Sequence, residues 1–370
     1  MKPEKIVING YYGMGNAGDE AVLACAIEEI SKAAPGSDIT VLSGDPGSTE
    51  RVYGVRAAKR MGLSALREIA ASDLYVSGGG SLLQDVTSAA SAMYYIALML
   101  FARVIGRKYA VFANGVGPLK RGWVRWFTKA AIDSASSVSV RDPGSLRLLE
   151  EIGVLRRDII LTSDPVFAIR PASREEVLKA VESCEGREVA GALEENAGRL
   201  AVISLRPWKG LDAGMEPLTR MVGMLRDEGY YPVGLAFQPD SDRGPLETLS
   251  NACKEGFPVV SCDFHPKTAA GLIKMAGATV GMRLHSLIIS ASQCVPAFGI
   301  SYDPKVDALY NMMPLGRSIK VEELMDSGEG ELRAFLSEIP GTARKIADSI
   351  PQIAARAADA AEQMIRKAES

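Results

Sequence analysis

The chain has 370 residues, of which 47% are hydrophobic and 24% are charged, and its formal net charge is −3. This length is sufficient for two globular domains with separate hydrophobic cores. The near-neutral charge excludes the basic surface that is typical of a nucleic-acid-binding domain, so we predict no nucleic-acid partner. Any anion site must then be built by a local group of cations.

Three features of the sequence indicate a cytoplasmic protein. The apolar run before Gly10 is too short for a secretory signal and instead predicts an opening strand. The apolar stretch 90–106 contains Arg103 and is shorter than the roughly 20 residues that cross a bilayer, which predicts a buried helix. The five cysteines are odd in number and form no CxxC pair, so we expect reduced thiols.

Taken in chain order, short apolar strands alternate with helical stretches, a pattern that predicts parallel sheets covered by helices on both faces. In the first half, strands are predicted at 5–9, 39–43, 74–77, 109–114, 137–141 and 159–162. In the second half, strands are predicted at 200–205, 232–237, 259–262, 279–282 and 297–301. Helices are predicted at 18–33, 214–228, 243–255, 266–276 and 285–293.

This order predicts an α/β fold with two Rossmann-like domains. The predicted segments are a first domain at 1–170, a Glu-rich helical linker at 171–198, a second domain at 199–335 and a helical tail at 336–370. We expect Pro340 and Pro351 to break the tail, because proline interrupts a helix. Ligands of such sheets bind beyond the carboxyl ends of the strands, so the loops at those ends are the first place to look for a site.

The first such loop, 10–20, contains the spacing G-x-G-x-x-G and leads into a helix. Glycines let the backbone approach a ligand closely, and a helix start offers unpaired amide groups. A dinucleotide fingerprint also needs an acidic residue after the second strand, where Asp45 is only a loose match. Two interpretations stay open: Asn16 or Asp19 caps the helix, or the loop serves sugar binding and base catalysis. The residues concerned are Gly15, Asn16, Asp19 and Glu20.

The second loop, 77–85, begins with three consecutive glycines. Such a run is costly in chain entropy unless another group must come close to the backbone. That group is either a substrate lying over Gly79 and Gly80 or a neighbouring element at a close helix–strand crossing. Gln84 and Asp85 could bind sugar hydroxyls, although Asp85 could equally cap a helix.

Basic residues stand at the ends of several predicted strands. Arg141 ends one in the first half, where its guanidinium could bind a carboxylate or phosphate, or form a salt bridge with Asp142 or another acid. In the second half, Arg206, Arg283 and Lys305 follow strands in the same way. His285 opens a helix beside Arg283, which makes it a candidate for proton exchange near neutral pH. Together these residues predict a site for a small, multiply charged anion.

Six segments resemble the polysaccharide pyruvyl transferase family, and most closely its CsaB type. They are GYYGMGNAGDEAVL at 10–23, SGGGSLLQD at 77–85, NGVGPL at 114–119, SVRDPGS at 139–145, SDPVF at 163–167 and GMRLHSLIISASQCVPAFGISYDPKV at 281–306. They occur in the order known for that family, whereas the predicted linker and tail match nothing. The resemblance implies two Rossmann-like domains facing a cleft that holds the active site, as in GT-B glycosyltransferases.

The resemblance also implies transfer of pyruvate from phosphoenolpyruvate to two sugar hydroxyls, which yields a cyclic ketal and phosphate. For the CsaB type, the acceptor is N-acetylmannosamine in a lipid-linked or polymeric precursor of a secondary cell wall polymer, and S-layer homology domains bind the ketal carboxylate. By motif position the donor is bound by Arg141, His285 and Lys305, with Arg283 beside the histidine. The acceptor-binding residues that we expect are Gly15, Asn16, Asp19, Glu20, Gly79, Gly80, Gln84 and Arg206.

The chemistry of this transfer suits the residues. Different cations can bind the carboxylate and the phosphate of the donor, and they can stabilise the phosphate as it leaves. His285 is the expected acid that protonates the methylene carbon, and Asp19 is the expected base, with Glu20 or Asp85 as alternatives. We expect no metal and no cofactor other than phosphoenolpyruvate as co-substrate, because the cations neutralise the donor and no His/Cys/Asp cluster shows ligand spacing.

A lipid-linked acceptor would bring the enzyme to the inner face of the membrane. Residues 119–129 hold two of the three tryptophans among four cations, a composition that suits an anionic lipid interface. An ordinary helix that buries Trp126 and Phe127 is the alternative. Two other functions remain to be weighed: a GT-B nucleotide-sugar glycosyltransferase, and a non-catalytic module that binds sugar or anion.

Overall fold

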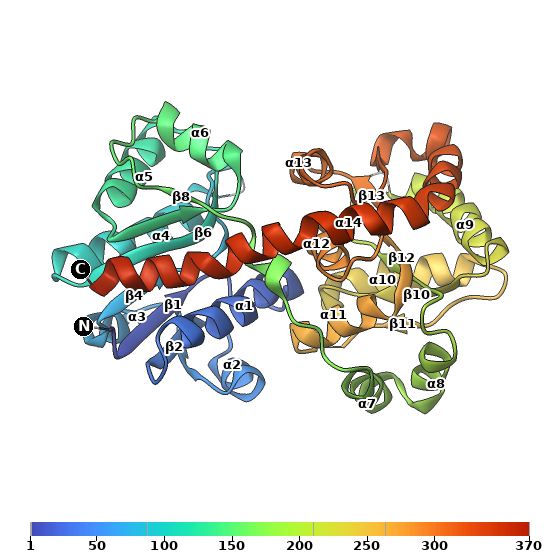
Figure 1. Cartoon of the computed structure of the whole chain (residues 1–370), viewed down its shortest axis with the longest axis horizontal. Coiled ribbons are helices and arrows are strands. Elements are labelled where there is room, and N and C mark those ends of the chain that lie inside the picture. Colours follow the sequence, from blue (N-terminus) through green and yellow to red (C-terminus); the bar gives the residue numbers. More distant parts are fainter. Residues whose placement is uncertain (1, 87, 210, 263, 370) are drawn as a thin grey trace. The chain divides into compact units, whose positions relative to one another are not determined.

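The computed structural model describes residues 2–86, 88–209, 211–262 and 264–369. It divides into two compact units: unit 1 comprises Met1–Ala168 and Ile353–Ser370, and unit 2 comprises Ile169–Gln352. Each unit is built on one parallel sheet with helices packed on both faces (Figure 1). The alternation of strands and helices in the sequence therefore predicted the fold class correctly.

The described strands of unit 1 form one sheet in the order β3-β2-β1-β4-β6-β7-β8, and β5 pairs with the end of β6. The strands are β1 (Lys5–Asn9), β2 (Asp38–Ser43), β3 (Arg56–Lys59), β4 (Leu74–Ser77), β5 (Gly80–Leu83), β6 (Lys108–Val116), β7 (Ser137–Val140) and β8 (Ile160–Leu161). The central strands are apolar along their length because both of their faces are covered.

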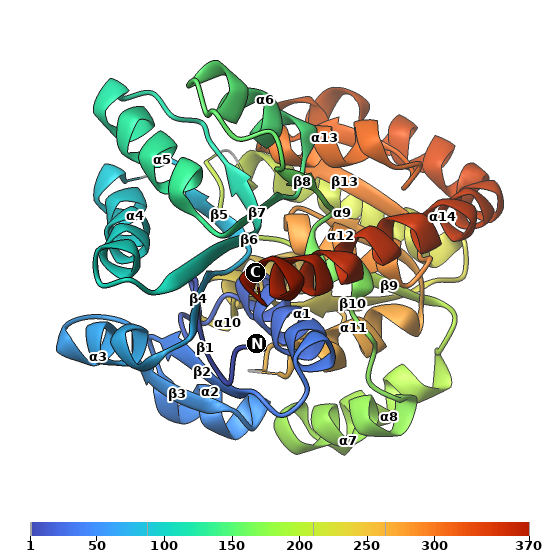
Figure 2. The same ribbon diagram turned by 60° about the vertical axis from the view of Figure 1, so that its left-hand side comes forward.

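Successive residues of these strands point to opposite faces and so fill two different cores. On one face, Val7, Tyr75 and Val111 pack with the helices from α3 to α6. On the other face, Ile8 and Phe112 pack with α1 and the end of α14, which lie over the same strands in Figures 1 and 2. The helices of this part of the chain are α1 (Ala17–Ala33), α2 (Pro46–Tyr53), α3 (Leu63–Ala71), α4 (Ala89–Val104), α5 (Gly122–Ser134), α6 (Pro143–Glu151) and the 3-10 turn η1 (Pro165–Ala168).

The described strands of unit 2 form a second sheet in the order β11-β10-β9-β12-β13-β14. They are β9 (Leu200–Ser204), β10 (Tyr231–Leu235), β11 (Val259–Val260), β12 (Ala276–Gly281), β13 (Ala297–Ser301) and β14 (Ser318–Lys320). The helices are α7 (Arg174–Glu185), α8 (Arg187–Glu195), α9 (Leu211–Asp227), α10 (Pro239–Ala252), α11 (Pro266–Lys274), α12 (Leu284–Ser292), α13 (Pro304–Met312), the 3-10 turn η2 (Val321–Glu323) and α14 (Leu324–Glu369). Ile203, Val280 and Phe298 pack with α9 and the start of α14 in its main core.

The last helix, α14, takes part in the cores of both units. Phe335 near its start belongs to the core of unit 2, and Ile365 near its end belongs to the core of unit 1. The expectation that Pro340 and Pro351 break this segment is wrong, because both lie inside one continuous helix. A proline removes one backbone hydrogen bond, and the apolar contacts at both ends of the helix offset that loss.

Some elements differ from the sequence-based expectation. Strands β3, β5 and β14 were not predicted, because each has only three or four residues and β3 is exposed along much of its length. The segment expected as a linker, 171–198, forms α7 and α8 and belongs to unit 2. The start of α7 is fixed by a capping box between Ser173 and Glu176.

The expectation of reduced thiols is wrong for two of the five cysteines. Cys184 at the end of α7 and Cys262 after β11 form a disulfide. They lie 78 residues apart, so their spacing gave no sign of the pairing. Cys253 and Cys294 are half-buried free thiols. In the part of the chain that the structure describes, no helix combines the length and the apolar character needed to cross a bilayer.

Candidate active site

In unit 1 the first two loops start side by side, because Asn9 at the end of β1 pairs with Ser77 at the end of β4. Asn16 caps α1 by accepting a hydrogen bond from the Gly18 amide at 3.1 Å, which confirms the capping interpretation for this residue. Its side-chain amide also donates to Asp19 Oδ2 at 2.7 Å. The cap therefore fixes the direction of the Asp19 carboxylate.

Glu20 holds the first loop together. Its Oε1 accepts a hydrogen bond from the Gly13 amide at 2.7 Å, and its Oε2 accepts one from the Tyr53 hydroxyl at 2.6 Å. Gly15 has a φ of +68°, and the position of an added β-carbon would meet no atom within 4 Å. Glycine is thus needed at this position for the left-handed backbone, and the space above it is open.

The consecutive glycines of the second loop serve mainly to pack the loop. A β-carbon at Gly78 would lie 2.3 Å from the Tyr12 hydroxyl oxygen, and one at Gly79 would lie 2.7 Å from Val22 Cγ1. Both glycines are buried, which favours the helix–strand crossing over a substrate at these two positions. Gly80 has a φ of +105°, and its added β-carbon would lie 3.2 Å from Asp19 Oδ1, so Asp19 lies against the second loop.

Arg141 follows β7 and is fixed by two loops of unit 1. Its Nη1 forms an ion pair with Asp164, and its Nη2 donates to Ser81 Oγ at 2.9 Å. A β-carbon at Gly115 would lie 2.9 Å from Arg141 Nε, so the guanidinium crosses closely over that backbone. The side chains of Arg141 and Asp164 are only 10% and 5% exposed. The salt-bridge alternative is therefore confirmed, and the pair presents a rigid, nearly buried cation at the sheet edge.

The contacts of Asp85 favour a structural role over a role as the base. Its two carboxylate oxygens accept hydrogen bonds from the Lys120 and Arg121 amides, both at 2.7 Å, and its side chain is fully buried. Burial alone would raise the pKa of Asp85, but the two backbone hydrogen bonds and the Arg121 charge outweigh burial and hold the pKa below its usual range. Gln84 accepts a hydrogen bond from the Val86 amide at 3.0 Å and shapes the same turn.

The sequence reasoning missed Arg60, which follows β3 in unit 1. Its guanidinium lies over the rings of Tyr11, Tyr94 and Tyr95, with carbon-to-centroid distances of 5.6, 5.1 and 5.8 Å. Its Nη2 donates to the Tyr95 hydroxyl at 3.0 Å, and its buried Nε has no hydrogen-bond partner among the described residues. Tyr11 belongs to the first loop and is 40% exposed. An arginine after a strand was a possible signal, but β3 itself was not recognised.

In unit 2 strands β9, β12 and β13 end at the same edge of the sheet, because Gly281 at the end of β12 pairs with Ser204 at the end of β9 and with Gly299 near the end of β13. Arg206, His285 and Lys305 follow these three strands. The topology therefore confirms that the residues singled out in the second half lie at one edge of one sheet.

Arg283 forms an ion pair with Asp242, which lies in the first turn of α10. Its Nε donates to Asp242 Oδ2 at 3.0 Å, and its Nη2 forms a second bond to Asp242 Oδ1. Gln238 Oε1 and Ser241 Oγ each accept from the same Nη2 at 3.2 Å. Asp242 is fully buried and Arg283 is 12% exposed. The guanidinium is thus largely occupied by protein acceptors.

His285 and Lys305 lie in the first turns of two helices that follow neighbouring strands. His285 is the second residue of α12 and is half-buried. Lys305 is the second residue of α13, is exposed, and donates its backbone amide to Asp303 Oδ1 at 2.9 Å. The starts of both helices carry partial positive charge, which adds to the lysine in favouring an anion at this edge.

Arg206 is part of a stack that the sequence did not predict. Its Nη1 donates to the Tyr302 hydroxyl at 2.8 Å, and its guanidinium carbon lies 4.7 Å from the centroid of the same ring. The ring of Trp208 lies 4.8 Å from that of Tyr302 and is 37% exposed. The cation and the two rings therefore form a partly exposed platform beside β9 and β13.

Two tryptophans of α5 lie on the surface of unit 1. Trp123 is 51% exposed and Trp126 is 64% exposed, so the alternative in which Trp126 is buried is wrong. Trp126 contacts Phe127 edge-to-face, with ring centroids 4.8 Å apart. Arg125 is exposed on the same helix and donates from Nε to the Leu119 carbonyl at 2.7 Å.

Comparisons with solved structures agree with the fold of two units, each built on a parallel sheet. The fold is similar to that of UDP-GlcNAc 2-epimerase from Neisseria meningitidis, with a TM-score of 0.60, 12% identity and coverage of 98% of this chain and 100% of the other. It is also similar to HepE from Anabaena, solved with UDP-glucose, with a TM-score of 0.61, 11% identity and 98% coverage of both chains. These likenesses establish two Rossmann-like units of the GT-B type.

The sequence comparisons are more specific. The amylovoran biosynthesis protein AmsJ from Erwinia amylovora is 21% identical over 272 residues, which cover 69% of this chain. The match spans 63% of the length of AmsJ. The family model for polysaccharide pyruvyl transferase matches residues 16–304, which include Arg141 and His285 and end one residue before Lys305. The chain therefore belongs to the polysaccharide pyruvyl transferase family.

Proposed function

We propose that the protein transfers pyruvate from phosphoenolpyruvate to two hydroxyls of a saccharide, forming a cyclic ketal and releasing phosphate. The observation that carries this proposal is the edge of the unit 2 sheet, where an imidazole, a lysine and two helix starts follow neighbouring strands. Phosphoenolpyruvate carries a carboxylate and a phosphate, and such groups bind favourably to cations and helix starts.

The residues have distinct roles in this proposal. Lys305 and the two helix starts of unit 2 are assigned to donor binding, and Arg141 of unit 1 is a further proposed donor-binding residue. Arg283 differs from what the resemblance implied: because Asp242 occupies much of its guanidinium, we assign it to positioning the start of α12. Asp164 and Ser81 bind one N–H group on each terminal nitrogen of Arg141, so only its remaining N–H groups can meet an oxyanion, in a preset orientation.

The reaction balances with two reactants. His285 as imidazolium donates a proton to the methylene carbon, and the first acceptor hydroxyl adds to the central carbon. The bond between the central carbon and the bridging phosphate oxygen breaks. Phosphate leaves with the electron pair of that bond, and the cations stabilise it. The second hydroxyl closes the ketal on the same carbon. A carboxylate base takes one hydroxyl proton and passes it to phosphate, which leaves as hydrogen phosphate, and the other hydroxyl proton restores the imidazolium.

Asp19 is the proposed base that takes the proton from the attacking hydroxyl. Asp85 is bound by two backbone amides, and Glu20 is bound by the Gly13 amide and the Tyr53 hydroxyl. Asp19 has one oxygen turned to Asn16 and the other turned to Gly80, between the two loops that we expect to bind the acceptor. Gly15, with open space above it, and Gln84 lie in the same two loops.

For the acceptor, we propose an N-acetylmannosamine-containing precursor of a secondary cell wall polymer, carried on a lipid. Arg60 and Tyr11 of unit 1 are candidates for binding its anionic or sugar groups. The platform of Arg206, Tyr302 and Trp208 in unit 2 is a separate candidate for stacking on a sugar ring. The exposed Trp123 and Trp126 with their neighbouring cations support peripheral contact with an anionic membrane. The ketal carboxylate would then serve to bind S-layer homology domains.

One incubation tests the proposal. The protein is mixed with phosphoenolpyruvate and an N-acetylmannosaminyl acceptor, and phosphate release and acceptor mass are followed together. Equal amounts of phosphate and pyruvylated acceptor are the expected result. Nucleotide release from a nucleotide sugar, with no change on phosphoenolpyruvate, would instead identify a glycosyltransferase. A ligand-dependent shift in melting temperature without turnover would identify a binding module.

A further inference from the structure

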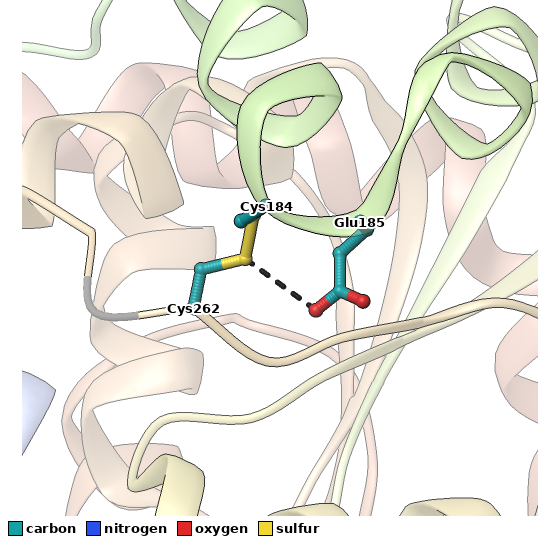
Figure 3. A group of neighbouring side chains, drawn as sticks. All are labelled: Cys184, Glu185 and Cys262. Carbon is teal, nitrogen blue, oxygen red and sulfur yellow. Dashed lines mark hydrogen bonds between the residues drawn. A yellow bond between two sulfur atoms is a disulfide. The ribbon is translucent and has the colours of Figure 1, made fainter.

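A second cluster of reactive groups lies in unit 2. Cys184 and Glu185 end α7, and Cys262 follows β11 (Figure 3). One ligand atom from each side chain, a sulfur or a carboxylate oxygen, lies within 4.8 Å of the other two. Two segments that are far apart in the sequence thus converge on one point with thiol and carboxylate groups, both of which Zn²⁺ accepts as ligands.

The carboxylate of Glu185 is held toward the sulfurs. Its Oε1 accepts a hydrogen bond from the Ser261 amide at 2.8 Å and lies 3.4 Å from Cys262 Sγ. A disulfide sulfur has no proton to donate, so the contact between carboxylate and sulfur gains a hydrogen bond only after reduction. The backbone amide meanwhile fixes the direction of the carboxylate, as outer-shell hydrogen bonds do in metal sites.

The geometry is close to that of a zinc site. Tetrahedral coordination at about 2.3 Å to sulfur and about 2.1 Å to oxygen separates these ligand atoms by about 3.6 Å. The observed 3.4 Å between Cys262 Sγ and Glu185 Oε1 already matches this separation. The two sulfurs must move apart to bind one ion, and Cys184 is exposed at the end of its helix, where its side chain can rotate.

We propose that, after the disulfide is reduced, Cys184, Glu185 and Cys262 bind one thiophilic divalent cation, with Zn²⁺ as the test ion. A phosphine or thiol reductant supplies two electrons to the disulfide, and two protons complete the two thiols. Metal binding then releases those two protons, because both sulfurs bind as thiolates. The cation offsets the negative charge of two thiolates and one carboxylate, and the fourth tetrahedral position is left to solvent.

The metal-bound form and the disulfide exclude each other, because each sulfur is bonded either to the other sulfur or, as a thiolate, to the metal. Both forms join the end of α7 to the segment after β11. β11 is a two-residue strand at the edge of the sheet. The site would therefore keep this edge in place under either reducing or oxidising conditions. The inference does not depend on pyruvyl transfer.

The test is a Co²⁺ titration of the full-length protein, reduced anaerobically with a phosphine. We expect a near-ultraviolet thiolate-to-cobalt band that saturates at one Co²⁺ per chain and disappears when Zn²⁺ is added. Cys184→Ser and Cys262→Ser should abolish the band, Glu185→Gln should weaken binding, and Cys253→Ser is the matched control that should keep it. The oxidised protein should give no band.

A second measurement needs no variant and so does not depend on folding of the mutants. Zn²⁺ should slow the alkylation of Cys184 and Cys262 in the reduced wild-type protein and leave that of Cys253 unchanged. The proposal is overturned if the reduced protein gives no thiolate band, if the band survives in the Cys184→Ser/Cys262→Ser double variant, or if Zn²⁺ protects none of the cysteines.

Discussion

The buried pair of Arg283 and Asp242 yields the sharpest prediction about stability. Asp242 is fully buried, and Arg283 is 12% exposed and binds both of its oxygens. Arg283→Met leaves a buried carboxylate without its cation, which costs about 3–5 kcal/mol in the free energy of unfolding of unit 2. The matched control is Arg243→Met, because Arg243 and Glu247 form an exposed pair one turn apart, 52% and 47% exposed. Losing such a pair costs at most about 1 kcal/mol.

The assay is urea unfolding followed by the fluorescence of Trp208, the one tryptophan of unit 2 among the three in the chain. Trp123→Phe and Trp126→Phe remove the two surface tryptophans of unit 1, so the signal reports unit 2. We expect the midpoint to fall strongly for Arg283→Met and slightly for Arg243→Met. Equal losses in both variants would refute the stabilising role. Retained stability with a higher KM for phosphoenolpyruvate would make Arg283 a donor-binding residue.

Four further predictions follow from particular contacts. Gly79→Ala should destabilise unit 1 by about 1–3 kcal/mol in thermal unfolding, because its β-carbon would lie 2.7 Å from Val22 Cγ1; Gly15→Ala is a control in which only the backbone conformation is strained. Arg141→Lys should raise the KM for phosphoenolpyruvate more than it lowers kcat, because lysine keeps the charge but loses the fork; an unchanged KM would remove Arg141 from donor binding. Trp208→Ala should raise the KM for the acceptor and leave that for phosphoenolpyruvate unchanged, and the reverse pattern would contradict the sugar platform. Exchange of Trp123 and Arg125 for polar neutral residues should weaken sedimentation with anionic liposomes, and unchanged sedimentation would refute membrane docking.

The sequence predicted well what depends on local periodicity. Strands such as β1, β4 and β13 were placed at their observed bounds, because a continuous apolar run between turn signals marks a strand that is covered on both faces. The position of Arg141 and His285 at strand ends followed from the same pattern. Short or exposed strands such as β3 carry no such run. Because β3 was not predicted, Arg60, which follows it, was not predicted as a candidate site residue.

What the sequence could not show depends on contacts between distant segments. Arg283 was expected at the donor because it lies beside His285, and nothing in the sequence indicated its ion pair with Asp242, 41 residues away on α10. A salt bridge of Arg141 was expected with Asp142 or another acid, and only the structure shows that the acid is Asp164. The consecutive glycines indicated a close approach, but only the structure shows that Tyr12 and Val22 are the groups that approach. Spacing along the chain carries no information on such pairings.

The most direct test of the central claim is to run the reaction in deuterated water and examine the product by nuclear magnetic resonance. If His285 protonates the methylene carbon of phosphoenolpyruvate, one deuterium must enter the methyl group of the ketal as phosphate is released. We predict a CH₂D methyl group in the wild-type product and loss of its formation in His285→Ala. A ketal methyl group without deuterium, or normal turnover in the His285→Ala variant, would contradict the account.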